Sequence, residues 1–207
     1  MSFTKVQIYN LACSALLLSK QFADIDTDLN SNEVKALNTH FENALTSTLS
    51  SLDIDSLSEP IPLELLADLG NQGPWQYVYK YPTRCAKFRR IQSGAVIDTS
   101  STSIDKRVAL YQGQKAIYTN EYAAVAECIV KDVSLAALSP SAGMAVAYKL
   151  AFLASPLVVG KGAAKLRDEV YRTYLLMLAE AQELDANENF NFETPWTRSE
   201  FVRTRLS

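Results

Sequence analysis

The sequence has few of the residues from which catalytic and metal sites are built. It contains one histidine, His40, and three cysteines that lie far apart, Cys13, Cys85 and Cys128. Three isolated thiols without a C-x-x-C pair do not make a disulfide framework or a zinc site. His40 has no cysteine or carboxylate at ligand spacing, so we expect a partly exposed helix residue.

The signatures of nucleophilic and phosphate-binding enzymes are also missing. No serine stands in a G-x-S-x-G string, and Gly160-Lys161-Gly162 lacks the upstream glycine of a phosphate-binding loop. A cell-wall hydrolase would need two carboxylates across a cleft, and the sequence shows no such pair. We therefore expect no catalytic residue, no metal, no cofactor and no small-molecule substrate.

Neither sign of charge dominates the chain. Its 207 residues carry a net charge of −3 with a pI near 5.3, and 48% of them are apolar. A weakly acidic chain does not fit a protein whose main role is to grip phosphates, and the apolar content predicts a folded core. The apolar run at residues 11–18 is followed by Lys20, too soon for a membrane span, so no membrane association is expected.

The hydrophobic periodicity predicts helices at both ends of the chain and strands between them. A surface connector is expected at residues 53–73, containing at most a short helical turn near 63–69. Asn30 is the predicted N-cap of the second helix. Ser139 and Pro140 are predicted to start a later helix, which Pro156 is expected to end. The expected helices are 4–20, 30–52, 123–138, 142–154 and 162–188, and the expected strands are 75–81, 86–92, 108–112 and 116–119.

These elements predict an α+β fold. Residues 1–73 and 123–188 form a bundle of about four helices, and residues 74–122 form one small antiparallel sheet inserted into it. Turns are expected at Ser93-Gly94 and Gln112-Gly113. Residues 189–207 are expected to form an extended C-terminal arm.

One basic group stands out between aromatic residues, and it consists of Arg84, Lys87, Arg89 and Arg90, with Tyr81 and Phe88 among them. Aromatic and cationic side chains together are typical of single-strand binding. On a regular strand, however, Lys87 and Arg89 share one face while Phe88 and Arg90 share the other, which favours a subunit interface, a lumen lining or a solvent face. The nearby acids Asp53, Asp55 and Glu59 have no calcium-loop spacing and are expected in solvent.

The C-terminal segment is rich in aromatic residues and arginine. Such a composition is typical of binding hot spots, so an interface with the portal or a neighbouring subunit is expected there. The alternative is that the aromatic side chains fold back onto their own helices. The residues expected at the interface are Phe190, Phe192, Trp196, Arg198, Phe201 and Arg203.

Several strings resemble the tail tubular protein A family, the head-to-tail adaptors of short-tailed bacteriophages. Residues 75–91, WQYVYKYPTRCAKFRRI, resemble its aromatic strand, proline, cysteine and basic strand. Residues 9–16, YNLACSAL, resemble its first helix, although Leu17-Leu18-Ser19 replaces the glycine that usually ends it. Tyr118-Thr119-Asn120 resembles the strand-to-helix junction, and residues 123–154 resemble the alanine-rich helices.

The resemblance implies a dodecameric ring between the portal protein and the tail nozzle protein. Its helical part would face the portal, its sheet would face the nozzle, and double-stranded DNA would pass through its lumen without sequence-specific contacts. Such a subunit belongs to the virion neck and assembles in the host cytoplasm. The alternatives are another phage neck or tail-completion protein, or a DNA-binding regulator.

Overall fold

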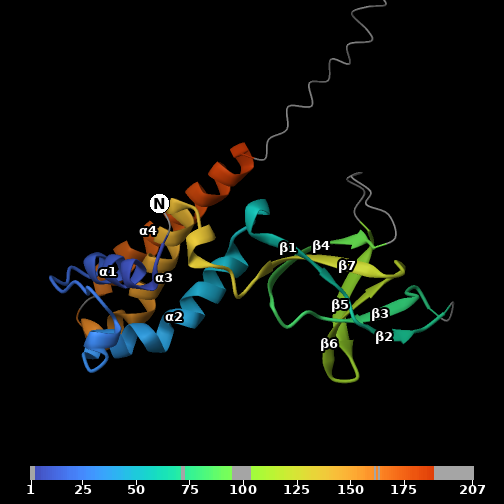
Figure 1. The fold of residues 1–207 in the computed structure, drawn as a ribbon, viewed down its shortest axis with the longest axis horizontal. Helices are drawn as coiled ribbons and strands as arrows, with labels where there is room; N and C mark the ends of the chain where they lie inside the picture. The colour runs from blue at the N-terminus through green and yellow to red at the C-terminus, as the bar shows by residue number, and fades with distance from the viewer. Residues whose placement is uncertain (1–2, 71–72, 95–103, 161, 163, 189–207) are drawn as a thin grey trace, which may run out of the picture.

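The computed structural model describes residues 3–70, 73–94, 104–160, 162 and 164–188. Helices occupy one end of the long axis and strands the other (Figure 1), which confirms the α+β class. The helices are α1 (Lys5–Ala15), α2 (Asn32–Ser51), α3 (Pro140–Val158) and α4 (Ala164–Glu188). The strands are β1 (Ser58–Pro62), β2 (Leu65–Asp68), β3 (Tyr77–Lys80), β4 (Cys85–Ser93), β5 (Lys106–Tyr111), β6 (Gln114–Thr119) and β7 (Ala124–Val130).

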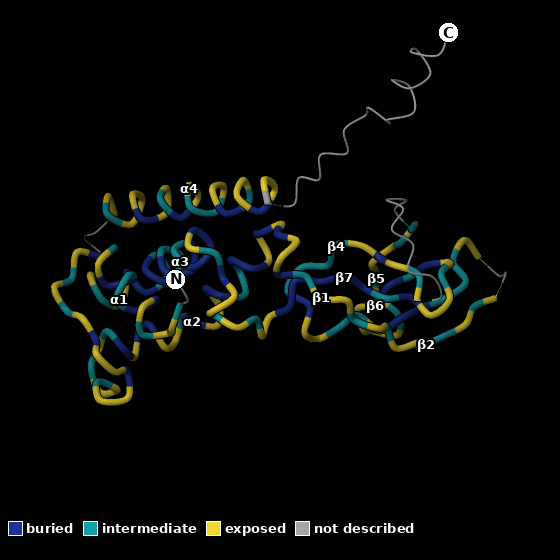
Figure 2. The backbone as a smooth tube through the Cα atoms, turned by 45° about the horizontal axis from the view of Figure 1, so that its top comes forward, coloured by how far each residue is buried: buried dark blue, intermediate teal, exposed yellow. Residues whose placement is uncertain are grey.

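The helical part is arranged around α3. Helices α1, α2 and α4 each pack against it, so the helices do not form the regular bundle that the sequence predicts. The small side chains of α3, among them Ala147, Ala151 and Ala154, are buried and allow this close approach. In Figure 2, α4 forms an outer layer whose inward side is buried and whose outward side is exposed.

Helix α3 is long and apolar enough to span a membrane by length and composition, which the sequence pattern did not indicate. Three other helices pack on it, as they do on the core helix of a globular fold. Its N-cap is as predicted: Ser139 Oγ accepts from the Ala142 N–H at 3.3 Å, with Pro140 in the first turn.

Pro156 does not end α3, contrary to expectation, because the helix continues to Val158. Proline cannot donate to the carbonyl four residues earlier. The Ser155 hydroxyl donates to that Phe152 carbonyl instead, at 2.9 Å.

The start of α2 and the end of α1 also differ from the predicted boundaries by a few residues. Helix α2 begins after Ser31, whose Oγ accepts from the Val34 N–H at 3.2 Å, and not after Asn30. Helix α1 ends at Ala15 rather than at residue 20, because Leu17 adopts a left-handed φ of 57°. The Leu18 N–H then donates to the Cys13 carbonyl and the Leu17 N–H to Ser14, both at 3.0 Å. This is the Schellman ending, which usually has glycine at the position of Leu17.

The strands form two antiparallel sheets rather than the one predicted. Sheet A has the order β1-β7-β4, and sheet B has the order β2-β3-β6-β5. Strands β1 and β2 lie in the predicted connector, and β1 accommodates Pro60 and Pro62 because it is an edge strand. The strand region therefore begins at Ser58 and ends at Val130, beyond 74–122 on both sides.

The prediction of a helix at 123–138 is wrong, since most of this stretch forms β7 and a short 3₁₀ turn, Leu135–Ala137. Strand β7 is the central strand of sheet A, and both of its faces are covered. Ile129 packs in the core of the helical part, while Ala126 and Cys128 pack in the cluster between the sheets. A strand buried on both faces shows no alternation, so its apolar run resembles a buried helix.

The turn at Gln112-Gly113 is confirmed, with φ of 49° and 81° at its two central residues. These values are typical of the two-residue hairpin turn that matches strand twist. The predicted turn at Ser93-Gly94 begins where β4 ends, and the residues that follow, 95–103, lie outside the described part of the chain.

We expect the substitution Leu17→Gly to stabilise the protein by about 1 kcal/mol, because glycine adopts the left-handed conformation without strain. The Leu17 side chain is 81% exposed, so its removal forfeits little packing. Urea unfolding monitored by circular dichroism measures the change. The matched control is Ser14→Gly at an exposed helical position, which should destabilise the protein; equal signs for the two variants would contradict this account.

Candidate functional site

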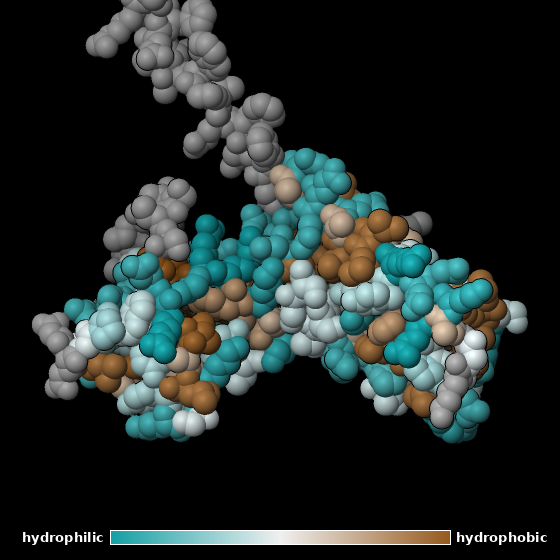
Figure 3. All heavy atoms as spheres, turned by 180° about the vertical axis from the view of Figure 1, so that it is seen from behind, coloured by the Kyte–Doolittle hydropathy of each residue, from teal (hydrophilic) through white to brown (hydrophobic). Residues whose placement is uncertain are grey.

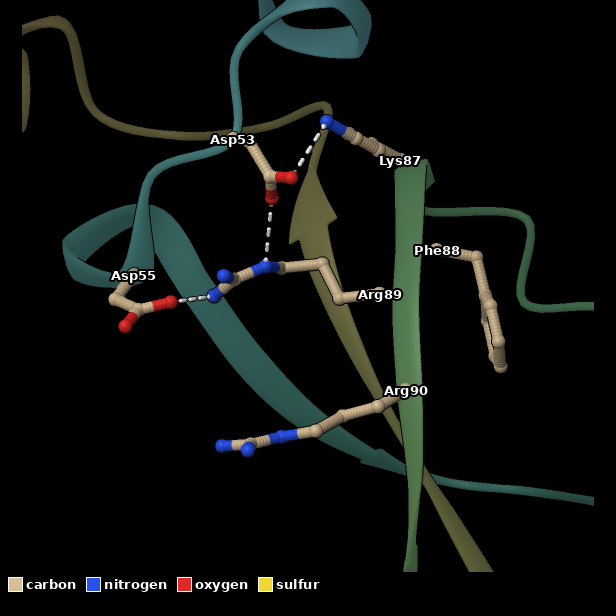
Figure 4. Close-up of a pocket in the computed structure, with 6 residues that line it drawn as sticks. All are labelled: Asp53, Asp55, Lys87, Phe88, Arg89 and Arg90. Carbon is tan, nitrogen blue, oxygen red and sulfur yellow. Dashed lines mark hydrogen bonds and ion pairs between the residues drawn. The ribbon is translucent and has the colours of Figure 1, made fainter. Parts of the chain in front are cut away.

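The predicted basic group lies where the sheets meet the helical part. Strand β4 faces the segment that leaves α2, and a pocket of about 320 Å³ separates them. Figure 4 shows Lys87, Arg89 and Arg90 extending from one side of β4 and Phe88 from the other. The residues lining the pocket are Asp53, Asp55, Lys87, Phe88, Arg89 and Arg90.

We call the region where the sheets meet the helical part the joint. Arg89 is its central cation. Its guanidinium pairs with Asp53 Oδ1 at 3.1 Å, with Asp55, and with Glu127 Oε1 at 3.2 Å. Burial alone would lower the pKa of Arg89, but these carboxylates raise it above its ordinary value. The side chain is only 20% exposed, so the three acids hold a charge that has lost most of its water.

Glu127 is the buried anion of the joint. Its carboxylate accepts from Arg90 Nε at 2.6 Å, from Gln92 Nε2 at 2.7 Å, and from Arg89 at 3.2 Å. The Ser58 hydroxyl adds a fourth bond at 3.3 Å. These partners come from β1 and β4 on the two sides of β7, so one carboxylate ties all three strands of sheet A together.

Asp185 connects α4 to the same place. Its carboxylate accepts from the Asp55 N–H at 2.7 Å, and from the Ser56 N–H and hydroxyl at 3.3 and 2.9 Å. One turn earlier, Gln182 Nε2 donates to the Ser51 carbonyl at 3.1 Å. The Asp55 carboxylate pairs with Arg89, and the Asp55 N–H donates to Asp185. Asp55 thus links β4 to α4.

Lys87 binds the backbone at the C-terminus of α2. Its amine donates to the Leu52 carbonyl at 2.9 Å and pairs with Asp53 Oδ2 at 3.4 Å. The last carbonyls of a helix carry partial negative charge and lack helical donors. Lys87 therefore caps α2 from the neighbouring sheet, and no basic residue of the last turn of α2 does so.

The predicted alternation of faces is wrong for Arg90. Strand β4 carries register shifts between Cys85 and Lys87 and between Phe88 and Arg90. Each bulge adds one residue and changes which face the following side chains take. Arg90 therefore joins Arg89 at Glu127, and with 57% of its side chain exposed it is the basic residue of the pocket that reaches furthest into solvent.

Arg84 is not part of the pocket. It pairs with Asp132 at 2.9 Å and with Glu59 at 3.3 Å on the surface. The acids that the sequence places in solvent, Asp53, Asp55 and Glu59, are thus the partners of the basic group. Ion pairing occupies the charges that single-strand binding would require.

Cys85 is a buried strand cysteine. It lies 3.3 Å from the Tyr81 hydroxyl and in one cluster with Cys128, and all three cysteines are free thiols. A hydrogen bond with Cys128 lowers the pKa of Cys85 to about 7 and raises that of Cys128. Since only 4% of Cys85 is exposed, a reagent in solvent does not reach the thiol.

This arrangement of residues provides charge pairing. Within the described ranges, no group of three or more His, Cys, Asp and Glu side chains is placed to hold a metal ion. His40 is half-buried on α2. The predicted interface residues Phe190, Phe192, Trp196, Arg198, Phe201 and Arg203 lie outside the described part of the chain.

The sequence did not single out the two buried acids of the joint. Glu127 is the one charge within the apolar run of β7, and Asp185 falls four residues after buried Ala181 on the inward stripe of α4. A charge at an apolar position requires buried partners. That signal marks both residues in the sequence, but it does not identify their partners.

We expect Arg89→Ala to lower the free energy of unfolding by about 2 kcal/mol, because Glu127 would lose a charged donor while remaining buried. The matched control is Arg84→Ala, whose ion pairs are exposed and whose loss should be far smaller. Urea unfolding of both variants gives the comparison. Equal losses would mean that Arg89 has no special role in the joint.

A scan against protein-family models finds no family that matches this chain, and a search of curated proteins finds no relative.

Proposed function

We propose that this protein is a structural subunit of a bacteriophage neck, a head-to-tail adaptor. Copies of the chain assemble in the host cytoplasm into a ring, of twelve in the family it resembles, between the portal and the tail nozzle. Double-stranded DNA passes through the lumen. The subunit carries out no chemistry of its own, and it acts by binding neighbouring copies, the portal and the nozzle.

The observation that carries the proposal is the place of residues 75–91 in the fold. This string resembles the aromatic strand, proline, cysteine and basic strand of the adaptor family, and it covers β3 of sheet B and most of β4 of sheet A. Its basic residues Lys87 and Arg89 fix the sheets to the helical part. The resembling residues therefore build architecture, which fits a mechanical part.

The charge pairing favours the structural adaptor over a DNA-binding regulator. Arg84, Lys87, Arg89 and Arg90 each have a carboxylate within ion-pair distance. A regulator would need such cations available to neutralise phosphates and release counterions. A lumen through which DNA slides gains from weak contacts, and paired cations supply weak contacts.

The outward face of α4 carries exposed apolar side chains, which supports an interface with another subunit or protein. Leu175 and Leu176 lie there, 45% and 66% exposed, one turn after half-exposed Tyr171. Apolar residues also show among hydrophilic ones on both parts of the molecule in Figure 3. Exposed apolar side chains grouped on one helix face are typical of an interface. In a ring, each such contact repeats with every subunit.

The C-terminal arm is the proposed attachment to a neighbouring subunit or to the portal. It follows Glu188, the last residue of α4, and Asp185 in the last turn of α4 binds Asp55 and Ser56 where the helices meet the sheets. Arginine and large aromatic residues dominate interface energetics, and residues 189–207 contain both.

We expect a chain truncated after Glu188 to fold with an unchanged circular dichroism melting curve but to lose ring formation or attachment to the portal of the same virus. Light scattering and cryo-electron microscopy of the mixture measure both properties. The matched control is the full-length variant Thr197→Ala with Ser199→Ala, which keeps the aromatic residues and arginines and should behave as wild type.

If the truncated chain still forms rings and attaches to the portal, the arm has no such role. If the wild-type chain forms no ring with that portal and instead binds DNA in a strongly salt-dependent way, the adaptor proposal is wrong and the regulator is right.

A further inference from the structure

Sheet B is an open sheet with two unpaired edges in the described part of the chain. Its order β2-β3-β6-β5 leaves β2 at one edge and β5 at the other. Every neighbouring pair in this sheet is antiparallel. With four strands, an even number, the two edge strands run in opposite directions.

The opposite directions of β2 and β5 determine how two copies could pair in a ring. If the edges of sheet B form the contact, the β2 edge of one copy lies against the β5 edge of the next, and rotational symmetry repeats this contact around the axis. Because the two edges run in opposite directions, β5 meets the next β2 in the antiparallel sense. The new pair would therefore have the same geometry as every pair already within sheet B.

One cross-strand row ends in an exposed apolar side chain at both edges. Register places Leu65 opposite Tyr79, Tyr79 opposite Ile117, and Ile117 opposite Val108, so all four lie on one face. Tyr79 and Ile117 are buried, whereas Leu65 and Val108 are 46% and 42% exposed. Edge-to-edge pairing would bring these two ends together as cross-strand neighbours.

The adjacent row on the same face ends in opposite charges. Asp68 lies opposite Tyr77, Tyr77 opposite Thr119, and Thr119 opposite Lys106. Neither Asp68 nor Lys106 forms an ion pair with another described residue.

Lys106 is a partly buried cation that has no carboxylate within ion-pair distance among the described residues. Its amine donates to the Arg89 carbonyl at 2.7 Å and lies 4.6 Å from the centre of the Phe88 ring. Burial lowers its pKa. A carboxylate from the next copy would offset that lowering, and Asp68, which is exposed, ends the same row.

The backbone of β5 directs N–H groups toward its open edge, although the Leu110 carbonyl there already accepts from the Tyr118 hydroxyl at 3.0 Å. The Gln112-Gly113 hairpin makes Tyr111 and Gln114 the first hydrogen-bonded pair, so in the alternation that follows Val108 and Leu110 direct their N–H groups away from β6. Leu110 is also 70% exposed. In sheet A, whose edge strands are β1 and β4, β1 contains Pro60 and Pro62, which cannot donate to another strand.

We infer that β5 of one copy pairs with β2 of the next, so that sheet B continues from subunit to subunit around the ring. Val108 then lies against Leu65, and Lys106 against Asp68, of the neighbouring copy. The occupant of each edge is a second copy of this chain. The inference rests on the proposed ring and identifies the surfaces that join its subunits.

The test traps the contact through engineered thiols. The double variant Leu65→Cys, Val108→Cys is held at high protein concentration in a glutathione redox buffer and run on a denaturing gel without reductant. We expect a ladder of dimers, trimers and larger species that a reductant removes. The native cysteines are buried, and the wild-type chain serves as the background.

Each single variant should stay at that background, because a head-to-tail contact does not place two copies of the same residue together. A ladder no stronger than in the single variants overturns the inference. Strong dimer formation by Val108→Cys alone also overturns it, since that result means a two-fold contact between two β5 strands.

Charge reversal tests the second row. Asp68→Lys in the double-cysteine background should reduce the cross-linked fraction about two- to five-fold, as like charges placed opposite each other repel. The matched control is Asp168→Lys on the exposed side of α4, which should leave the fraction unchanged. Equal effects of the two reversals would overturn the predicted register.

Failure of the inference and failure of the proposed function are distinguishable. If the wild-type chain forms a ring on the portal but the double variant gives no ladder, the edges do not join the subunits and the adaptor proposal stands. If no ring forms on the portal but the ladder appears, edge pairing is supported and the adaptor proposal fails.

Discussion

Two buried carboxylates, Glu127 and Asp185, hold the sheets and the helices in one arrangement. Glu127 binds side chains from β1 and β4, and Asp185 binds the backbone that leads from α2 into β1. Asp55 belongs to both sets of contacts, through Arg89 and through its own N–H. Because a buried charge that loses its partners is costly, this network favours a single orientation of the two parts.

A fixed orientation is what the proposed adaptor role requires. A subunit that contacts one neighbour through its helices and another through its sheets passes force and position between them only if the joint is stiff. Lys87 capping α2 and Gln182 binding the Ser51 carbonyl add further contacts between elements distant in sequence. The cations that resemble a nucleic-acid site are therefore committed to structure, and this explains why paired acids surround them.

Local signals in the sequence predicted most helices and the strands β3, β4, β5 and β6. The cap at Ser139, the apolar stripe of α2 and the Gln112-Gly113 turn depend on neighbours in the chain, which a sequence displays. Strand β7 was missed because burial on both faces removes alternation, and β1 because its prolines are tolerated only at an edge. The bulges that turn Arg90 toward Glu127 and the pairing of Asp185 with residues 55 and 56 are tertiary, so no local pattern specifies them.

A double-mutant cycle on Arg89→Ala and Asp185→Ala tests most directly whether these residues act as one joint. Arg89 pairs with the Asp55 carboxylate, and Asp185 accepts from the Asp55 N–H. If they form one network, the loss in unfolding free energy of the double variant will differ from the sum of the single losses by about 1 kcal/mol or more. Additivity within about 0.3 kcal/mol would contradict the account, because the sheets and the helices would then be held independently.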